Sequence, residues 1–332
     1  MSILVTGGCG FIGSNFINRI YIDYPNLAIV NVDKISYCSN KKRIDAEIRQ
    51  DAKRYALYEE NINNYEKIFE ILNTHEVAFV VHFAAQSHVQ NSFADSLHFT
   101  EDNVKGTHTL LEACRLYGKI KKFIHCSTDE VYGETPLGNN QQKLETSMMC
   151  PTNPYAATKA GAELIATSYF YSYKMPICIT RGNNVYGPHQ FPEKVIPLFV
   201  TRLLNGTNVN IQGSGSATRG FLYIDDVVNA FITIFDKGEP GQVYNIGCEE
   251  GNEITIKDLA LTLGKLIFPA SDEQFLDKKI HFIEDRPFND HRYYISSDKL
   301  KNLGWNSATP LSEGLKKTID FYKNIIDSGN IP

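Results

Sequence analysis

The glycine-rich turn after the first apolar run most constrains the fold of this chain. Ile3-Leu4-Val5-Thr6 has the pattern of a buried strand, and it leads into Gly7, Gly10 and Gly13 before a helical pattern begins. Glycines let a backbone turn tightly and approach a pyrophosphate, whose charge the helix N-terminus stabilises. The turn therefore predicts the first β–α unit of a dinucleotide-binding fold, although an ordinary strand-to-helix turn has similar glycines.

Strands and helices continue to alternate through the first half of the chain. Further apolar runs, each separated by enough residues for a crossover helix, lie at 28–32, 77–82, 122–126 and 177–181. This rhythm is that of βαβ units, in which a parallel sheet is buried on both faces. We therefore predict an α/β fold with a Rossmann-type, doubly wound parallel sheet.

The regular alternation ends near residue 180, beyond which Pro, Gly and Asn punctuate the chain. Because 332 residues exceed what one compact core usually supports, we predict two domains. Residues 1–180 would form the Rossmann domain, and residues 181–332 a smaller mixed α/β lobe. Two strand-like pieces near 219–247, at 219–224 and 243–246, are expected to return to the first sheet.

Composition excludes several classes of function. A net charge of −5 gives no general attraction for nucleic acid or for an acidic membrane, so neither is an expected partner. The seven cysteines form no CxxC pair and have no His at metal-ligand spacing, which argues against a disulfide framework and a metal site. With no targeting pattern and no apolar run long enough to span a bilayer, we expect a soluble, cytoplasmic protein.

Asp33 supports the dinucleotide interpretation. It ends the second strand, twenty residues beyond Gly13. A carboxylate at this point can accept hydrogen bonds from the adenosine ribose hydroxyls and would repel a 2′-phosphate. The predicted cofactor is therefore NAD rather than NADP.

Tyr155 and Lys159 are candidate groups for hydride-transfer chemistry. They lie four residues apart on a predicted helix and so share a face. Tyrosine has a pKa near 10, and a neighbouring ammonium group can lower it enough for the phenolate to act as a base. The spacing alone also fits an unremarkable pair on a helix surface.

Thr128, Asp129 and Glu130 directly follow a predicted strand, where ligands bind in doubly wound folds. The acidic pair has a plain interpretation, because carboxylates at a helix N-terminus are stabilised by the helix dipole. In the functional interpretation one carboxyl is kept protonated as a general acid and the other is an ionised general base. The sequence does not separate the two pKa values.

The chain resembles the nucleoside-diphosphate-glucose 4,6-dehydratases of the extended short-chain dehydrogenase/reductase family. Its GxxGxxG turn and its Tyr-Lys pair match the wider family. The more specific matches are Ala84-Ala85-Gln86-Ser87-His88-Val89, Ser127 to Gly133, Asn153-Pro154-Tyr155, Tyr186-Gly187-Pro188, Phe191-Pro192-Glu193-Lys194, Tyr244-Asn245-Ile246-Gly247 and Asp285-Arg286-Pro287. Related 4-epimerases usually lack the adjacent Asp129 and Glu130, and related decarboxylases keep only the Glu.

The resemblance implies an internal oxidation, elimination and reduction. Tyr155, aided by Thr128 and Lys159, would take the proton of the sugar C4 hydroxyl as hydride passes from C4 to NAD. Glu130 would then remove the C5 proton while Asp129 protonates the departing C6 hydroxyl. The hydride would return to C6, so NAD is regenerated in each turnover, stays tightly bound and needs no metal.

The resemblance also assigns binding residues. For the cofactor they are Gly7, Gly10, Phe11, Ile12, Gly13, Asp33, Lys34, Asn61, Ile62, Ala84, Ala85, Ser87, Tyr155 and Lys159. For the nucleotide sugar they are Ser87, Thr128, Asn184, Lys194, Val195, Asn210, Gln212, Arg219, Asn245, Asp285, Arg286 and Asn289, mostly in the second domain. The chain departs from many relatives at Asn61, Val185 and Asp102, where the family often has Asp, Asn and Thr.

Three alternatives stay open. Pieces such as Thr180-Arg181-Gly182-Asn183-Asn184 look closer to the plant dehydratases that use UDP-glucose than to the bacterial enzymes that use dTDP-glucose, which favours UDP-glucose only slightly. A nucleotide-sugar 4-epimerase and a non-catalytic NAD-binding protein would both share the fold. By resemblance we also expect a homodimer that pairs helices near 100–117 and 155–173.

Overall fold

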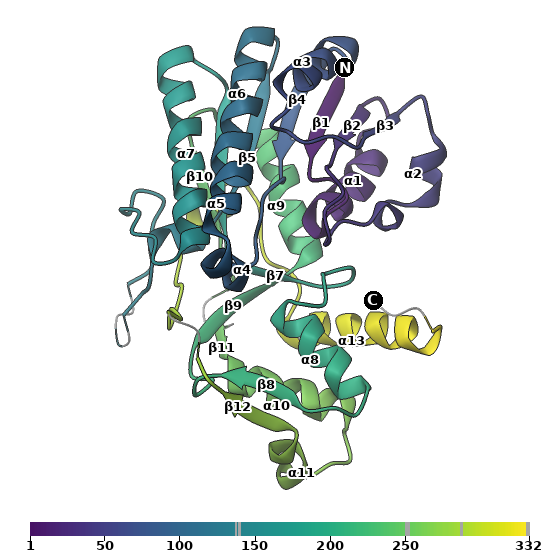
Figure 1. The fold of residues 1–332 in the computed structure, drawn as a ribbon, viewed down its shortest axis with the longest axis vertical. Coiled ribbons are helices and arrows are strands. Elements are labelled where there is room, and N and C mark those ends of the chain that lie inside the picture. Colours follow the sequence, from purple (N-terminus) through teal and green to yellow (C-terminus); the bar gives the residue numbers. More distant parts are fainter. Residues whose placement is uncertain (137, 139–140, 250–252, 286–287, 330–332) are drawn as a thin grey trace.

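A seven-stranded parallel sheet forms the centre of the molecule (Figure 1). The computed structural model describes residues 1–136, 138, 141–249, 253–285 and 288–329. In spatial order the strands are β10 (Val243–Ile246), β6 (Ile177–Gly182), β5 (Lys122–Thr128), β4 (Val77–His82), β1 (Ser2–Thr6), β2 (Ala28–Val32) and β3 (Tyr55–Tyr58). The predicted doubly wound parallel sheet is confirmed.

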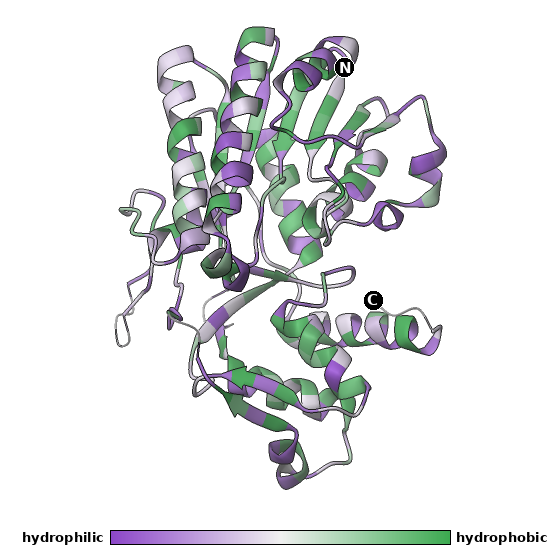
Figure 2. Ribbon diagram, viewed as in Figure 1, coloured by the Kyte–Doolittle hydropathy of each residue, from purple (hydrophilic) through white to green (hydrophobic). Residues whose placement is uncertain are grey.

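Helices cover both faces of this sheet. One layer contains α3 (Tyr65–Thr74), α6 (Gly106–Tyr117) and α7 (Pro154–Tyr173), and the other contains α1 (Phe11–Asp23) and α9 (Ile224–Lys237). Alternate residues of β1 point to opposite faces of the sheet. Leu4 packs against the layer with α3 and α6, and Ile3 and Val5 pack against the layer with α1 and α9. Figure 2 shows the resulting hydrophobic strands between helices of mixed character.

The second lobe holds two small sheets. One contains β7 (Asn184–Tyr186), β9 (Thr218–Tyr223) and β11 (Glu253–Thr255), and the other contains β8 (Val209–Gln212) and β12 (Ile280–Ile283). The helices of the chain beyond β7, apart from α9, are α8 (Val195–Leu204), α10 (Ile256–Ile267), α11 (Glu273–Lys278), α12 (Asp298–Lys301) and α13 (Leu311–Asp327). Among the described residues, no helix combines the length and apolar character that crossing a membrane requires.

One of the two predicted returning strands is placed wrongly by sequence. The segment 243–246 does join the large sheet, as β10 beside β6, but β9 pairs with β7 and β11 instead. The sequence of a short apolar run does not show with which strand it will pair. Strand β7 starts two residues after β6 ends and forms a separate sheet, in which β9 pairs with it. The division into two domains near residue 180 stays a prediction.

Short elements lie beyond the carboxyl ends of the parallel strands and lead into the site. They are η1 (Lys41–Arg43), α4 (Val89–Ala94), α5 (Ser96–Phe99), the π-helical η2 (Thr100–Lys105) and the 3₁₀ turn η3 (Asp129–Tyr132), whereas the short helix α2 (Ala46–Gln50) lies beside β3. The second lobe faces the same edge of the sheet (Figure 1). In open α/β sheets ligands bind at this edge.

Helix α7 is fixed at its start and along its buried face. Asn153 caps it by accepting a hydrogen bond from the Ala156 N–H (2.8 Å), and Pro154 occupies the first turn, where it loses no helical hydrogen bond. Further along, Glu163 forms a buried ion pair with Arg181 of β6. Lys159 lies one turn before Glu163 on α7. The ion pair between Glu163 and Arg181 therefore also fixes the position of Lys159 along the strands of the sheet.

Candidate active site

One cavity of about 750 Å³ runs from the glycine turn to the second lobe. It brings together nearly all of the predicted site residues, which come from the edge of the large sheet and from the second lobe and span more than 280 residues of sequence. The predicted residues that line it are Gly7, Gly10, Phe11, Ile12, Gly13, Asp33, Lys34, Asn61, Ile62, Ala84, Ala85, Ser87, Thr128, Asp129, Glu130, Tyr155, Lys159, Asn184, Lys194, Val195, Asn210, Gln212, Arg219, Asp285 and Asn289. Two predicted residues are not among them.

Asn245 is a wrong assignment, because its side chain is structural. It lies on β10, is fully buried and does not line the cavity. Its Oδ1 accepts a hydrogen bond from the Tyr132 hydroxyl (2.8 Å), and its Nδ2 donates to the Lys143 carbonyl (3.2 Å). Arg286, the other predicted residue, lies outside the described residues.

The glycine turn is packed too tightly against other backbone for any larger residue. Gly7 has φ +71°, and a Cβ there would lie 2.7 Å from the Ala84 nitrogen. A Cβ on Gly13 would lie 2.3 Å from the Gly7 carbonyl oxygen. The backbone can therefore approach a ligand closely at the start of α1, whose first N–H groups have no helical partners.

Asp33 is held rigidly at the end of β2. Its Oδ2 accepts a hydrogen bond from the Cys9 N–H (2.9 Å), and its Oδ1 accepts from the Ile35 N–H (2.8 Å) and the Ser39 hydroxyl (2.9 Å). A carboxylate can accept about four hydrogen bonds, so capacity for a ribose hydroxyl remains. Only 5% of Asp33 is exposed, which keeps the carboxylate in one orientation.

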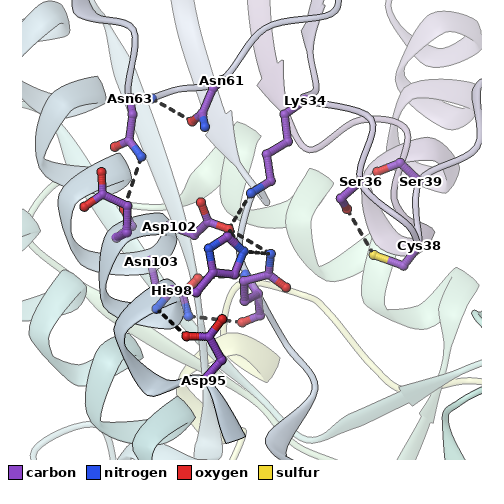
Figure 3. A network of polar contacts seen from close by, with 12 residues as sticks. Lys34, Ser36, Cys38, Ser39, Asn61, Asn63, Asp95, His98, Asp102 and Asn103 are labelled. Carbon is purple, nitrogen blue, oxygen red and sulfur yellow. Dashed lines mark hydrogen bonds and ion pairs between the residues drawn. The ribbon is translucent and has the colours of Figure 1, made fainter. Parts of the chain in front are cut away.

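Lys34 and Asp102 form an ion pair at the same end of the cavity (Figure 3). The Lys34 ammonium lies 2.5 Å from Asp102 Oδ2, and that oxygen also accepts from Gln86 Nε2 (2.7 Å) and lies 3.2 Å from His98 Nε2. Asp102 is thus the common acceptor for side chains of three segments. Its replacement of the frequent Thr changes the local chemistry from a hydroxyl to a neutralised carboxylate.

The neighbouring wall of the cofactor end is cross-linked by Asn103. Its Oδ1 accepts a hydrogen bond from the Gln86 N–H (2.7 Å), and its Nδ2 donates to the Gln86 carbonyl (3.1 Å) and to Thr158 (2.9 Å). The loop after β4, segment η2 and helix α7 are therefore joined through one side chain. Asn61 forms its own turn, in which its Oδ1 accepts from the Asn63 N–H (3.0 Å; Figure 3).

Asp129 is a buried carboxyl whose proton affinity is high. It is 3% exposed, and burial together with the charge of Glu130 raises the pKa of Asp129 to about 7. Asn183 Nδ2 donates to its Oδ2 (2.6 Å), and the Thr128 hydroxyl donates to its Oδ1 (3.2 Å). Asp129 is therefore a group that can be protonated near neutral pH.

Glu130 has different neighbours, although it is the next residue. Asn153 Nδ2 donates to its Oε2 (3.0 Å), and the Tyr293 hydroxyl lies 3.4 Å from the same oxygen. Burial raises the pKa of Glu130, and Asn153 and the positive charges of Arg219 and Lys194 oppose that rise. The two adjacent carboxyls thus have different hydrogen-bond partners; burial raises the pKa of both, and Lys194 opposes the rise at Glu130 while Asp290 adds to it.

Tyr155 and Lys159 lie as predicted on one face of α7, but their electrostatics differ from the expectation. Burial, and then the charge of Glu130, raises the pKa of Tyr155 well above its usual value. Lys159 donates to the Cys126 carbonyl (2.6 Å), and burial lowers the pKa of Lys159. The predicted lowering of the Tyr155 pKa by Lys159 is therefore wrong for this geometry, since desolvation of the phenolate outweighs it.

Lys194 and Arg219 are two of the cations that line the cavity from the second lobe, and Arg202 of α8 is another. Lys194 caps α8 and donates to the Ser87 carbonyl (2.7 Å), and burial lowers the pKa of Lys194. Arg219 of β9 donates to the Asp290 carbonyl (2.7 Å) and to Asn289 Oδ1 (3.3 Å). Both side chains are held by neutral oxygens, so their charge remains available to an anionic ligand.

Several residues in contact with the reacting groups had no role in the sequence interpretation. Asn183 and Asn153 hold the two carboxyls, and Tyr293 joins Glu130 to Asp290 through a 2.5 Å hydrogen bond to the Asp290 carboxylate. The sequence signal for Asn153 was its position before Pro154 at a helix start. Among the described residues, no group of three or more His, Cys, Asp and Glu side chains is arranged to hold a metal.

Known proteins share both the sequence and the fold. A family model described as GDP-mannose 4,6 dehydratase matches residues 4–318. The chain is 44% identical to a human dTDP-D-glucose 4,6-dehydratase, over 97% of this chain and 89% of the human one. The dTDP-glucose 4,6-dehydratase of Streptomyces venezuelae, solved with NAD bound, superposes with a TM-score of 0.90 at 35% identity, covering 98% of this chain and 97% of the other.

A longer plant protein is also similar. The chain is 46% identical to a trifunctional protein of Arabidopsis thaliana whose activities are UDP-glucose 4,6-dehydratase, UDP-4-keto-6-deoxy-D-glucose 3,5-epimerase and UDP-4-keto-L-rhamnose reductase. The match covers 97% of this chain and 47% of the plant protein, so the chain spans about half of that relative's length. Family model, relatives and fold agree, and the chain belongs to the nucleotide-sugar 4,6-dehydratases of the extended short-chain dehydrogenase/reductase family.

Proposed function

We propose that this protein is a nucleoside-diphosphate-glucose 4,6-dehydratase that converts UDP-glucose or dTDP-glucose to the 4-keto-6-deoxy sugar nucleotide. The observation that carries the proposal is the adjacent pair Asp129 and Glu130, which lie beside Tyr155 in unlike environments. Elimination of water needs one group to give a proton while another removes one. An epimerase, which only moves hydride to and from C4, has no use for this pair.

The residues present fit NAD as the cofactor. The glycine turn lines the cavity with backbone that carries no side chains, and the anchored Asp33 carboxylate suits free ribose hydroxyls rather than a 2′-phosphate. When bound, NAD would accept hydride from sugar C4, return it at C6 and supply a positive ring that favours the Tyr155 phenolate. Lys159, Ser87, Ala84 and Ala85 would orient it from the opposite wall.

Tyr155 and Thr128 would remove the proton of the C4 hydroxyl and pass it on. Thr128 and Tyr155 both line the cavity and Thr128 opposes the rise that burial causes in the pKa of Tyr155, and the Thr128 hydroxyl donates a hydrogen bond to Asp129 Oδ1 (3.2 Å). This arrangement offers a path by which a proton taken from C4 reaches Asp129. Lys159 donates a hydrogen bond to the Cys126 carbonyl. This bond would fix the position of the face of α7 that carries Tyr155.

Glu130 and Asp129 would carry out the elimination. Once C4 is a ketone, its electron withdrawal acidifies the C5 proton. Glu130 removes this proton, the C5–C6 double bond forms, and the C6–O bond breaks. Asp129 gives its proton to the leaving oxygen, which departs as water. Glu130 then returns its proton to C5 when C6 is reduced.

The second lobe would bind the nucleoside diphosphate. Arg219 and Lys194 bring positive charge to the cavity, and Asn210 and Gln212 of β8 line it at the far side. The guanidinium group of Arg219 can bind two phosphate oxygens at once. The similarity to the plant protein supports UDP-glucose, and the similarity to the human one supports dTDP-glucose, so the nucleotide is left to the experiment.

Incubation of purified protein with each sugar nucleotide, without added NAD, tests the proposal. We expect one of the two to yield the 4-keto-6-deoxy product by NMR, because the cofactor is retained and regenerated. Tyr155→Phe is the matched control and should be inactive. UDP-galactose as the product would select the epimerase, and no conversion of either substrate by folded, NAD-loaded protein would reject the dehydratase.

We also propose a cytoplasmic homodimer that pairs the outer faces of α6 and α7. Large apolar side chains are exposed there, among them Leu116, Leu164, Tyr171 and Tyr173. Apolar surface of this kind is typical of a protein interface. Light scattering should give twice the chain mass, and charged substitutions at Leu164 and Tyr171 should give the single-chain mass.

A further inference from the structure

Asn183 contacts the Asp129 carboxyl through its side-chain amide. It lies between β6 and β7, is 6% exposed, and its Nδ2 donates to Asp129 Oδ2 over 2.6 Å. A donor–acceptor distance of this length marks a strong hydrogen bond to a carboxyl oxygen. Nothing else in the proposed reaction uses Asn183.

The orientation of the Asn183 amide is determined by its other partner. The Cys248 N–H donates to Asn183 Oδ1 (3.0 Å), so the oxygen of the amide must face Cys248 and the nitrogen must face Asp129. Gly220 encloses the amide closely, because a Cβ there would lie 3.1 Å from Asn183 Oδ1. The amide is therefore held in one orientation.

This orientation has a consequence for the proton on Asp129. An amide NH₂ donates hydrogen bonds and has no lone pair to accept one. Asp129 Oδ2 is therefore always the acceptor in the bond to Asn183, in both protonation states. When Asp129 carries a proton, this hydrogen bond favours the proton on Oδ1, because an unprotonated oxygen is the better acceptor for the amide.

We propose that Asn183 is a positioning residue that places the acidic proton of Asp129 on Oδ1, where Thr128 can replenish it. The proposal rests on the dehydratase function above. The Thr128 hydroxyl donates to Oδ1 over 3.2 Å, and Thr128 and Tyr155 line the same cavity. Oδ1 is thus the oxygen at which a proton passed on by Thr128 would arrive.

The protons released and taken up in the reaction balance if Asp129 Oδ1 both gives and regains its proton. One proton leaves the C4 hydroxyl on oxidation, and one proton leaves Asp129 to make water from the C6 hydroxyl. The C5 proton moves to Glu130 and back. The proton from C4 therefore restores Asp129, provided that the path through Thr128 ends at the oxygen that acts.

The amide also stabilises the carboxylate that forms when Asp129 gives up its proton. Other charged or titratable groups that act on Asp129 are Glu130 of η3 and Arg219 of β9, and Tyr155 of α7 and Cys248 after β10 also face it. Loss of the amide donor removes a stabilising hydrogen bond from the carboxylate, so the carboxyl holds its proton to higher pH.

Asn183→Asp is the test. The new side chain has the same shape and can still accept from Cys248, but its second oxygen does not donate to Asp129 when ionised. We expect kcat to fall about 100-fold with KM within about twofold of wild type, because one positioned proton transfer contributes about 10²–10⁴ to rate. Because oxidation at C4 does not need Asp129, the absorbance of reduced nicotinamide should accumulate after substrate is added.

Asn183→Ser is the second variant, since its hydroxyl can donate to Asp129. We expect a smaller loss, about tenfold, and an alkaline limb of the kcat profile shifted upward by about one pH unit. Cys248→Ala is the matched control, because it changes packing beside Asn183 but keeps the backbone N–H, and it should stay within about twofold of wild type.

Three results separate the possibilities. Asn183→Asp with wild-type kcat overturns the proposal, and so does a variant that loses C4 oxidation along with elimination, because Asn183 would then shape the site in general. A wild-type protein that binds NADH but dehydrates neither sugar nucleotide rejects the proposed function instead. Melting temperatures of all variants confirm that they are folded.

Discussion

The two ends of the cavity hold carboxyl groups in opposite ways. At the cofactor end, Asp102 is neutralised by the Lys34 ammonium at 2.5 Å. At the reacting end, the closest donors of Asp129 and Glu130 outside their own turn are the side-chain amides of Asn183 and Asn153. Both ends are largely buried, so burial does not explain the difference.

The difference follows from what each carboxyl has to do. An ammonium partner stabilises the ionised form and so opposes protonation, which suits a group that only anchors a segment. An amide holds a carboxyl in place but carries no charge, so the proton affinity can remain high. Asp129, with a pKa of about 7, can therefore give and regain a proton within one turnover.

The largest expected effect is that of Glu130→Gln. The variant keeps the shape and the hydrogen bond to Asn153 but cannot remove the C5 proton, so we expect turnover to fall by a factor on the order of 10³ or more. Oxidation at C4 should continue, and rapid mixing should show a stable reduced nicotinamide signal. Loss of that signal would mean that Glu130 acts before the elimination.

Asp129→Asn should have the next largest effect on turnover, a loss of about 100-fold. The amide cannot give a proton to the C6 hydroxyl, although hydroxide can leave slowly without one. Replacing the C6 hydroxyl with fluorine removes the need for an acid, and it should restore most of the lost rate. If the fluorinated substrate reacts as slowly as glucose itself, Asp129 is not the acid.

The pH dependence of the wild type should show the same acid. Asp129 acts in its protonated form, and its pKa is raised to about 7, so kcat should fall by about tenfold for each pH unit above that value. The alkaline limb should be absent with the fluorinated substrate. A kcat that stays constant well above neutral pH would contradict the assignment.

The smallest effects concern stability, and they should differ in sign between the two ends. The folded-state pKa of Asp129 lies above its usual value of 3.8, so its ionisation in the unfolded chain costs stability as pH rises from about 4 to about 7. Asp129→Asn should therefore raise the free energy of unfolding at pH 8 by about 1–2 kcal/mol.

Asp102→Asn should instead lower that free energy by about 1 kcal/mol, because it removes a partly buried ion pair. It should also release NADH about fivefold faster, as should Lys34→Met, with no further gain in the double variant. Glu101→Gln, which breaks the exposed pair with Lys105 next door, is the control and should change neither quantity. If Asp102→Asn raised the free energy of unfolding, the two ends of the cavity would not differ in the sign of this effect.

The sequence predicted the features that local pattern encodes. The glycine turn, Asp33 and the order of Thr128, Asp129 and Glu130 lie at strand ends, where position along the chain already determines position in the fold. Asn183 was missed because it acts on a residue 54 positions away, and β9 was assigned to the wrong sheet because its partner strand was not identifiable. Asn245 failed for a similar reason, since no pattern showed which side of β10 its amide faces.

The protonation state of Asp129 tests the account most directly. Isotope-edited infrared difference spectra of wild type and Asp129→Asn, recorded across a pH titration, isolate the carboxyl band of this one residue. We predict a protonated carboxyl that titrates with a pKa near 7. An Asp129 that is already ionised well below neutral pH would contradict the claim that burial and the charge of Glu130 keep it ready to donate a proton.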